Sequence, residues 1–320
     1  MVKSEHVIQV KNLKKSYGKV SVLKGINLDI ERGTMLALLG PNGAGKTTTV
    51  RILSTLLDYD DGKVLIEGHD VRHEADEVRA VIGLTGQSAA IDELLTGREN
   101  LVMMGRLYRL TKKSAISRAE ELLTEFDLLD AADRKAKTYS GGMRRRLDLA
   151  VSLIASPPII FLDEPTTGLD PRSRLSMWKI IKSLMERGTT ILLTTQYLEE
   201  ADQLADSIVV IDGGKVIAKG TAKQLKAKIG NDRLELTFAN KSDLAKSITL
   251  LNKSVVDSDD NELTVSLLIK DSNVDVRETL GTLAKARIKV VSMAIHKPTL
   301  DDVFLSLTGK QKVKKTAEEK

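Results

Sequence analysis

The sequence predicts an α/β domain of about 230 residues followed by a smaller α+β domain. Short apolar runs alternate with segments of helical periodicity over the first part of the chain. A glycine-rich turn at residues 40–45 joins one such run to a helical segment, which is typical of a parallel sheet with helices packed on it. Beyond Gly230, helix and strand patterns alternate over about 75 residues, which indicates a second, smaller domain.

Apolar runs bounded by turn residues locate the elements of the first domain. A helix is expected to follow the glycine-rich turn, from Lys46 to about residue 54. Two more helices are expected to start at Ser140 and Asp170, because both residue types cap helices and a proline follows the second. Residues 91–137 are polar with spaced leucines, which predicts a helical insert. Strands are expected at residues 7–10, 26–30, 35–39, 64–67, 159–163, 190–194, 208–211 and 215–218.

The second domain and the tail complete the expected organisation. We divide the chain into residues 1–230, residues 231–308 and a basic tail, residues 309–320. The tail holds five lysines and two glutamates and so carries much of the net charge of +5. We interpret it as disordered and solvated, with contact to an anionic membrane surface as the alternative. In the second domain, strands are expected at residues 234–238, 263–268 and 288–295, and helices at residues 244–251 and 274–284.

Composition excludes several function classes. The 320 residues include no cysteine, so disulfides, thiol catalysis and cysteine-bound zinc are excluded. Aromatic residues make up only 3%, too few for the stacking platforms of proteins that bind single strands, and we expect no nucleic-acid partner. No apolar run approaches the roughly 20 residues that span a bilayer, and the N-terminus does not resemble a signal peptide. We therefore expect no membrane span, and a membrane process would need a second chain.

The turn after the third expected strand matches the P-loop pattern, in which two glycines bracket four residues and Lys and Thr follow. Its glycines let several backbone N–H groups face one anion, and the helix that follows adds the positive end of its dipole. Lys46 is expected to contact the β- and γ-phosphates of ATP, and the Thr47 hydroxyl to bind Mg²⁺. An ordinary glycine turn is the alternative, which the complete pattern and its position disfavour. The expected phosphate-binding residues are Gly40, Pro41, Asn42, Gly43, Ala44, Gly45, Lys46, Thr47 and Thr48.

Two acidic residues, Asp163 and Glu164, follow an apolar strand. In open parallel sheets, ligands bind at the C-terminal ends of the strands. Asp163 is expected to hold Mg²⁺ through water, and Glu164 to accept a proton from an attacking water molecule. Strands often end in acidic residues for structural reasons, so this prediction depends on the P-loop being present as well.

A third motif, formed by Ser140, Gly141, Gly142 and Met143, lies about twenty residues before Asp163 and resembles the signature of the ABC ATPase family. It opens a helix and so provides a second helix N-terminus for an anion, with a simple capped helix as the alternative. The resemblance implies a P-loop NTPase core with an antiparallel β subdomain and a helical subdomain. It also implies a homodimer in which two copies pair head to tail, so that each signature closes on the ATP held by the other P-loop.

Further residues match the pattern of the family, which the chain resembles over residues 5–230. The resemblance implies that Tyr17 stacks on adenine. It implies that Gln87 touches Mg²⁺ and the attacking water and senses a membrane partner. It also places Asp170 in the loop that crosses the dimer interface.

One position departs from the family, because Gln196 stands where a histidine is usual. Glutamine can hydrogen-bond a γ-phosphate or orient water, but it cannot carry a proton as imidazolium can. We therefore expect Glu164 to act as the base, Gln196 as a positioning residue and Lys46 as the catalytic cation.

The glutamine at this position, the run Tyr139 to Asp148 and the segment 298–304 make the chain similar to the daunorubicin-resistance type of drug-export ATPase over nearly its whole length. This resemblance implies an amphipathic drug, antibiotic or lipid-like cargo and a separate multi-span membrane permease. It also implies a peripheral location on the cytoplasmic face of the cell membrane. Residues 87–95 are expected to transmit motion to the permease, and the second domain to regulate or support the dimer.

Two other functions stay open at this point. A non-transport ABC ATPase, of the translation-factor or DNA-repair type, usually has a second cassette or a coiled-coil insert, and the chain has one P-loop and no heptad run. A regulatory module that binds ATP without hydrolysing it is disfavoured by the presence of Lys46, Asp163 and Glu164. Import is the alternative direction of transport.

Overall fold

The structure is a computed structural model that describes residues 6–86, 91–228, 232–252, 254–269 and 273–307. The chain divides into two compact units after Ala222, at the first residue of helix α8 (Ala222–Ala227). This division precedes the boundary that the sequence predicts near Gly230. No helix in the described part of the chain is both long enough and apolar enough to cross a membrane.

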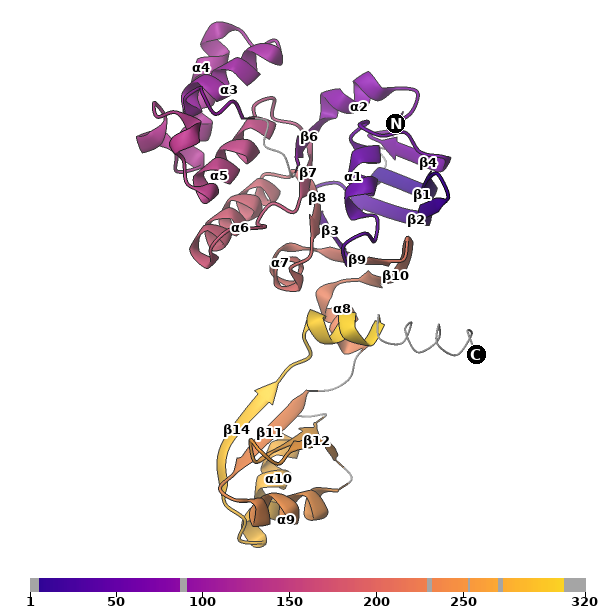
Figure 1. Ribbon diagram of the computed structural model, residues 1–320, viewed down its shortest axis with the longest axis vertical. Helices are drawn as coiled ribbons and strands as arrows, with labels where there is room; N and C mark the ends of the chain where they lie inside the picture. Colours follow the sequence, from indigo (N-terminus) through magenta and orange to yellow (C-terminus); the bar gives the residue numbers. More distant parts are fainter. Residues whose placement is uncertain (1–5, 87–90, 229–231, 253, 270–272, 308–320) are drawn as a thin grey trace. The chain divides into compact units, whose positions relative to one another are not determined.

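The first unit is built on a six-stranded sheet with the order β10-β9-β3-β8-β7-β6 (Figure 1). Neighbouring strands from β9 to β6 are parallel, and β10 joins the edge as an antiparallel strand. The strands are β3 (Met35–Leu39), β6 (Ile82–Thr85), β7 (Ile159–Asp163), β8 (Thr190–Thr195), β9 (Ser207–Asp212) and β10 (Lys215–Gly220). The α/β architecture predicted from the sequence is therefore confirmed.

Both faces of this sheet are buried, and they belong to two different cores. In β7, Ile160 and Leu162 pack with the helices, whereas Ile159 and Phe161 pack with the second sheet of the unit. Successive side chains of a strand point to opposite faces, so a run of four apolar residues is what a strand covered on both sides requires. The carboxylate of Asp163 then follows at the end of a rigid, fully buried element.

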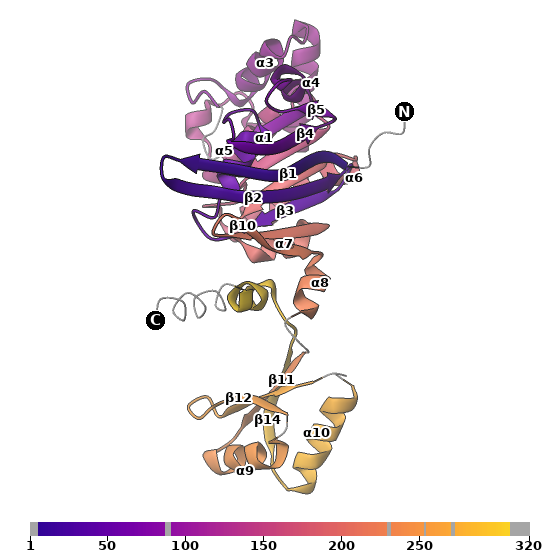
Figure 2. The same cartoon turned by 90° about the vertical axis from the view of Figure 1, so that its right-hand side faces the viewer.

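The second sheet of the unit is antiparallel, with the order β2-β1-β4-β5. Its strands are β1 (His6–Tyr17), β2 (Val20–Glu31), β4 (Asp61–Ile66) and β5 (His69–Asp70), and Figure 2 shows β1 and β2 as one long hairpin. Helix α1 (Lys46–Leu53) lies between the two sheets, since its Val50 and Ile52 share a core with both. The expected strands at residues 7–10 and 26–30 cover only parts of β1 and β2, because polar residues interrupt the apolar pattern of this exposed hairpin.

Helices cover the other face of the main sheet (Figure 1). Within the expected insert at residues 91–137, the structure has α3 and α4, which pack against each other, and two short 3₁₀ turns. Thr96 starts α3 with a capping box, in which its side chain and that of Glu99 each accept a hydrogen bond from the other's backbone N–H. Besides α1, the helices of this unit are α2 (Ala75–Val81), α3 (Gly97–Leu107), α4 (Lys112–Glu125), α5 (Gly141–Ser152), α6 (Pro171–Glu186) and α7 (Leu198–Leu204).

The second unit contains an antiparallel sheet with the order β12-β13-β11-β14. Leu234, Leu236 and Phe238 alternate along β11 and share one core with Leu244 and Leu283 of the two helices. Its elements are β11 (Arg233–Phe238), α9 (Lys241–Leu251), β12 (Val255–Asp259), β13 (Thr264–Leu268), α10 (Val274–Lys285) and β14 (Val290–His296), followed by a helical segment at residues 300–307.

Several elements were not predicted. They are α2, α7, α8, β5, β6, β12 and the helical segment at residues 300–307, and each is short or largely polar. The strand pattern of β12 is weak because four of its five residues are exposed. Elements of this kind form because their neighbours in the fold hold them, which a local pattern does not reveal.

Candidate active site

The glycine-rich turn folds as a loop between β3 and α1. Gly45 has a left-handed φ of 108°, and a β-carbon there would lie 2.4 Å from the Cδ2 atom of Leu23 in β2. A side chain at this position would therefore be strained and would collide with the hairpin. The backbone N–H of Ala44 donates to the Pro41 carbonyl at 3.2 Å, which curls the loop.

Lys46 is the first residue of α1, and its side chain turns back over the loop. It is 5% exposed, and its Nζ donates to the carbonyls of Gly40 at 2.8 Å and Pro41 at 3.2 Å. Burial lowers the pKa of Lys46, while the nearby carboxylates of Glu164 and Asp163 act in the opposite direction. The ammonium group is thus placed beside the loop and within the field of both acidic residues.

A cavity of about 350 Å³ adjoins the loop. Its wall combines the N-terminal turn of α1 with one residue of the hairpin and the acidic residue after β7. The residues that line it are Val22, Asn42, Gly43, Gly45, Lys46, Thr47, Thr48 and Glu164. The structure thus brings most of the predicted phosphate-binding loop together with the predicted base.

Asp163 ends β7 and is 3% exposed. Its Oδ1 accepts a hydrogen bond from the Thr194 hydroxyl of β8 and lies 3.4 Å from the Oγ1 atom of Thr47. These oxygen donors suit Mg²⁺, which proteins hold with one or two carboxylates while the phosphates of the substrate and water supply the other ligands. Among the described residues, no group of three or more His, Cys, Asp or Glu side chains could hold a metal ion by itself, and a site that shares the ion with phosphates does not require one.

Glu164 adopts a left-handed backbone conformation with a φ of 52°. Its N–H donates to the Thr194 carbonyl at 3.0 Å and lies 3.2 Å from the Thr194 hydroxyl. Its Oε2 accepts from the Thr167 hydroxyl at 3.3 Å. A strained conformation held by several contacts is frequent at functional sites. Thr194 was not predicted as a site residue, because a threonine in a strand has no distinctive sequence pattern.

Gln196 follows β8 directly and is exposed. The register aligns Thr195 with Leu39 of β3 on one side, and Thr194 with Asp163 of β7 on the other. Because parallel strands end at the same edge, the chain at Gln196 emerges between the P-loop and the acidic pair. Gln87, by contrast, lies outside the described residues.

A buried carboxyl group, that of Glu200 in α7, anchors the segment that follows Gln196. Glu200 is fully buried, and its Oε1 accepts from the indole N–H of Trp178 at 3.0 Å. Burial raises the pKa of Glu200, although hydrogen bonds from Thr195 and Trp178 favour the ionised form. This group anchors α7 and therefore the loop that carries Gln196.

The signature residues lie at the start of α5. The Ser140 hydroxyl accepts from the Met143 N–H at 3.2 Å, so Ser140 caps the helix as predicted. A β-carbon at Gly142 would lie 2.6 Å from the Ser173 hydroxyl oxygen of α6. Asp170 caps α6 by accepting from both the N–H and the hydroxyl of Ser173, at 3.0 Å and 2.6 Å.

The signature and the P-loop do not line the same cavity in one copy of the chain. Gly141 lines a different cavity, of about 590 Å³, together with Arg144 and Thr167. Glu164 lines both cavities. In one chain, the two predicted phosphate-binding helix ends therefore line different cavities.

Tyr17 lies at the tip of the β1–β2 hairpin, opposite Val20, and its side chain is 47% exposed. Val22, two residues farther along β2, lines the phosphate cavity. The Nζ atom of Lys15 lies 5.7 Å from the centre of the Tyr17 ring. The ring is thus accessible, and it belongs to the same hairpin as Val22, which lines the loop cavity.

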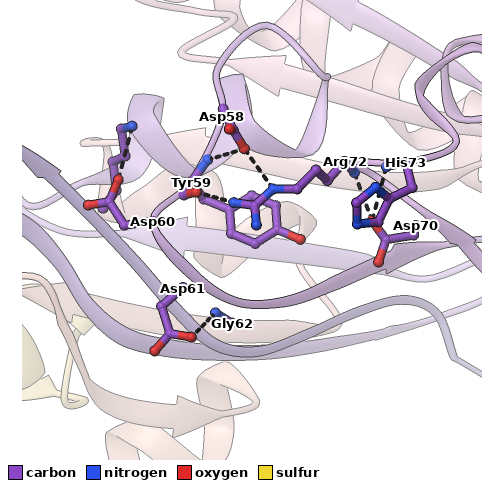
Figure 3. A network of polar contacts seen from close by, with 9 residues as sticks. Asp58, Tyr59, Asp60, Asp61, Gly62, Asp70, Arg72 and His73 are labelled. Atoms are coloured by element: carbon purple, nitrogen blue, oxygen red, sulfur yellow. Dashed lines mark hydrogen bonds and ion pairs between the residues drawn. The ribbon is translucent and has the colours of Figure 1, made fainter.

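The turn after α1 fixes this hairpin tip. Asp60 accepts from the Ser16 N–H at 2.6 Å and from the Lys15 ammonium at 3.3 Å. The turn itself is rigid, because Arg72 lies over the Tyr59 ring at 4.0 Å and donates to Asp58 at 2.9 Å (Figure 3). The contacts of Asp60 with Ser16 and Lys15 were not predicted, since those partners lie more than forty positions away in the chain.

We expect Asp60→Ala to weaken ATP binding by about fivefold to tenfold. A base stacked on an aromatic ring contributes about 1–3 kcal/mol to binding, and the variant should lose part of that contribution. Its loss frees the strand end that carries Tyr17, whereas the phosphate loop is untouched. Calorimetric titration should therefore show unchanged affinity for Mg²⁺-tripolyphosphate, which has no base. Asp61→Ala is the matched control, because it removes an exposed ion pair with Lys14 and a local hydrogen bond from the Gly62 N–H, and neither contact holds Ser16. An equal loss for both ligands would contradict the role of Asp60.

Family models match both units. The model described as ABC transporter matches residues 23–167, and that described as ATP-binding protein DrrA1-3-like, C-terminal domain, matches residues 220–308.

Curated relatives extend over nearly the whole chain. The daunorubicin resistance ATP-binding protein DrrA3 of Streptomyces coeruleorubidus is 50% identical over 306 residues, which cover 96% of this chain and 97% of that protein. The doxorubicin resistance ATP-binding protein DrrA of Mycobacterium tuberculosis (strain ATCC 25618 / H37Rv) is 43% identical, with coverage of 96% and 95%. The linearmycin resistance ATP-binding protein LnrL of Bacillus subtilis (strain 168) is 35% identical, with coverage of 95% and 99%.

Solved structures agree with the fold. An ATP-binding subunit of an ABC transporter aligns with a TM-score of 0.63 at 29% identity, covering 69% of this chain and 92% of that one. The ATP-binding cassette MJ0796, solved as a dimer in a post-hydrolysis state with ADP and Pi, aligns with a TM-score of 0.61 at 29% identity, covering 67% and 98%. The chain is an ATPase that belongs to the ATP-binding proteins of ABC transporters, in the group of the daunorubicin-resistance ATP-binding proteins.

Proposed function

We propose that the chain powers the export of an amphipathic drug, antibiotic or lipid-like molecule through a separate multi-span permease. The observation that carries the proposal is the assembled P-loop cavity, whose wall contains both the predicted base, Glu164, and the predicted catalytic lysine, Lys46. The cargo class is supported by relatives named for resistance to daunorubicin and linearmycin, and by one named a Nod factor export ATP-binding protein in Burkholderia lata. Their names describe resistance or export, which favours this direction over import.

Hydrolysis needs a base, a cation and a positioned water molecule. In our proposal, Lys46 contacts the β- and γ-phosphates, and Thr47 and Asp163 hold Mg²⁺, which when bound neutralises charge on the phosphate oxygens. The oxygen of a water molecule attacks the γ-phosphorus, its proton passes to the Glu164 carboxylate, and the bond to the β-phosphate oxygen breaks to release ADP. Gln196 orients the water or the γ-phosphate through its amide, without accepting the proton.

Two copies are proposed to share each ATP. The start of α5, from Ser140 to Gly142, offers free N–H groups and a positive dipole end, but it lies outside the residues that line the P-loop cavity of its own chain. Head-to-tail pairing would bring this helix end to the partner's ATP, with Asp170 at the interface and Tyr17 on the adenine. ATP then favours the closed pair by its greater affinity for that state, and hydrolysis releases it.

The remaining assignments follow from this arrangement. We propose that the permease places the chain at the cytoplasmic face of the membrane as a peripheral subunit, and that Gln87 and its neighbours sense the permease. Residues 231–308 are proposed to be an accessory domain that supports or regulates the dimer. Residues 309–320, the basic tail, lie outside the described part of the chain.

An accumulation assay tests the export function. Cells that express the chain with its permease should retain less daunorubicin, followed by its fluorescence, than cells that express Glu164→Gln with the same permease. Equal retention would contradict drug export. Copurification of the chain with ribosomes or DNA in place of a membrane protein would favour the non-transport alternative.

A further inference from the structure

Arg145 of α5 reaches the backbone that carries the predicted base. Its side chain is only 13% exposed. Its Nε donates to the Pro165 carbonyl at 2.9 Å, and its Nη2 donates to the carbonyls of Asp163 at 3.0 Å and Glu164 at 2.9 Å. Its Nη1 donates to the Gly86 carbonyl at 2.7 Å, just after β6. One guanidinium therefore holds the ends of two neighbouring strands.

Three successive carbonyls can point at one cation only where the backbone departs from the extended conformation of a strand. In an extended strand, successive carbonyls point in alternating directions. The left-handed conformation of Glu164, with a φ of 52°, breaks this alternation. The contacts of Arg145 thus stabilise the same strained residue that presents the catalytic carboxylate.

The charges around the Arg145 guanidinium favour a fixed position for it. Burial lowers the pKa of Arg145, and the nearby carboxylate of Asp148 acts against that effect. Asp148 lies one turn farther along α5, is 3% exposed, and approaches Nη1 to 3.5 Å. An arginine with this set of partners stays charged and has its five N–H donors directed in a fixed fork.

The two neighbouring arginines on α5 make different contacts. Arg144 pairs with Glu93 at 3.1 Å. Arg146 donates to the Phe126 carbonyl at 2.9 Å and to the Asp127 carboxylate at 3.0 Å, both just after α4. Because consecutive helical residues point about 100° apart, only the middle arginine of the three faces the catalytic strand.

We propose that Arg145 is a positioning residue that couples the two nucleotide sites of the dimer. It lies one turn after Ser140–Gly142, the helix end that would close on the partner's ATP, and it grips the backbone of Glu164 in its own site. Engagement of one ATP by α5 then sets the position of the base that acts on the other ATP. This inference rests on the head-to-tail pairing proposed above.

The test compares Arg145→Gln with Arg146→Gln in the full chain assembled with its permease. A small displacement of a catalytic group can cost about 10²-fold in rate, so we expect kcat of Arg145→Gln to fall by about that factor. The KM for ATP should change by less than about threefold, because the P-loop is intact, and the Hill coefficient for ATP should fall toward 1. Arg146→Gln should keep the wild-type kcat and Hill coefficient. Equal behaviour of the two variants would overturn the proposal.

A double variant separates positioning from charge balance. Arg145→Gln removes a cation from beside the buried Asp148 carboxylate, which can impair folding by itself. Arg145→Gln with Asp148→Asn removes both charges, and we expect the loss of kcat to persist at a wild-type melting temperature. Recovery of kcat in the double variant would overturn the proposal, since Arg145 would then only balance Asp148.

Measurements of ATP-dependent pairing and cooperative hydrolysis on the wild type separate the role of Arg145 from the head-to-tail dimer on which it rests. Wild-type chains that neither pair on ATP nor hydrolyse it cooperatively would contradict the head-to-tail dimer, and with it the coupling. Wild-type chains that do both, while Arg145→Gln does the same, would contradict only the role of Arg145.

Discussion

Glu164→Gln is expected to lower the rate of ATP hydrolysis by about 10³-fold, within the range that a positioned general base contributes. Glutamine keeps the shape of the side chain and can still accept from the Thr167 hydroxyl, but it cannot take the proton of the attacking water. Phosphate release by the full chain with its permease measures the effect. ATP affinity should be unchanged or higher, because the P-loop and Lys46 are intact.

The same variant should also accumulate the closed dimer. With ATP bound and hydrolysis blocked, size-exclusion chromatography with light scattering should show a dimer that requires ATP. Glu199→Gln is the matched control, because Glu199 is an exposed acidic residue in the first turn of α7, and it should hydrolyse at the wild-type rate. A Glu164→Gln chain that hydrolyses ATP at full rate would show that another group acts as the base.

The parts of the site that the sequence predicted are those formed by short, continuous segments. The P-loop at residues 40–47 and the pair Asp163 and Glu164 each combine a strand end with the residues that follow it, so one local pattern contains both the fold and the chemistry. The signature start at Ser140 is likewise a local helix cap, which the structure shows with its hydrogen bond to Met143. The fold class follows from the same alternation of strands and helices.

The parts that the sequence did not predict depend on residues far apart in the chain. Arg145 holds the Gly86 carbonyl across 59 positions, and Asp60 holds the Ser16 N–H across 44. Thr194 became identifiable only through the register that sets it beside Asp163. No local pattern distinguishes such residues from ordinary arginine, aspartate or threonine, because their partners are set by the packing of whole elements.

The second domain shows that some secondary-structure elements, too, cannot be predicted from a local sequence pattern. The alternation of Leu234, Leu236 and Phe238 predicted β11, because every second residue faces a core. β12, in contrast, has one half-buried residue, Val255, and its position is set by pairing with β13. A strand stabilised by its neighbour in this way lacks the alternating pattern on which sequence analysis relies.

The phosphate loop itself provides the last prediction. Lys46→Met is expected to reduce ATP affinity by at least about 10²-fold, because hydrogen bonds from a charged group contribute roughly 1.5–3 kcal/mol each and Nζ would contact two phosphates. The change also leaves the carbonyls of Gly40 and Pro41 without their donor and removes the cation that faces Asp163 and Glu164. The nucleotide site then carries two carboxylates with no lysine to balance them.

Calorimetric titration with ATP and Mg²⁺ measures this loss, and thermal unfolding shows whether the chain still folds. Arg51→Met is the matched control, since it removes a cation from the last turn of the same helix, where the dipole does not face the phosphates. The control should bind ATP normally. A Lys46→Met chain that binds and hydrolyses ATP as the wild type does would contradict the assignment of this loop as the phosphate site. No other lysine lines the described cavity, and the helix dipole alone contributes only about 1 kcal/mol to phosphate binding.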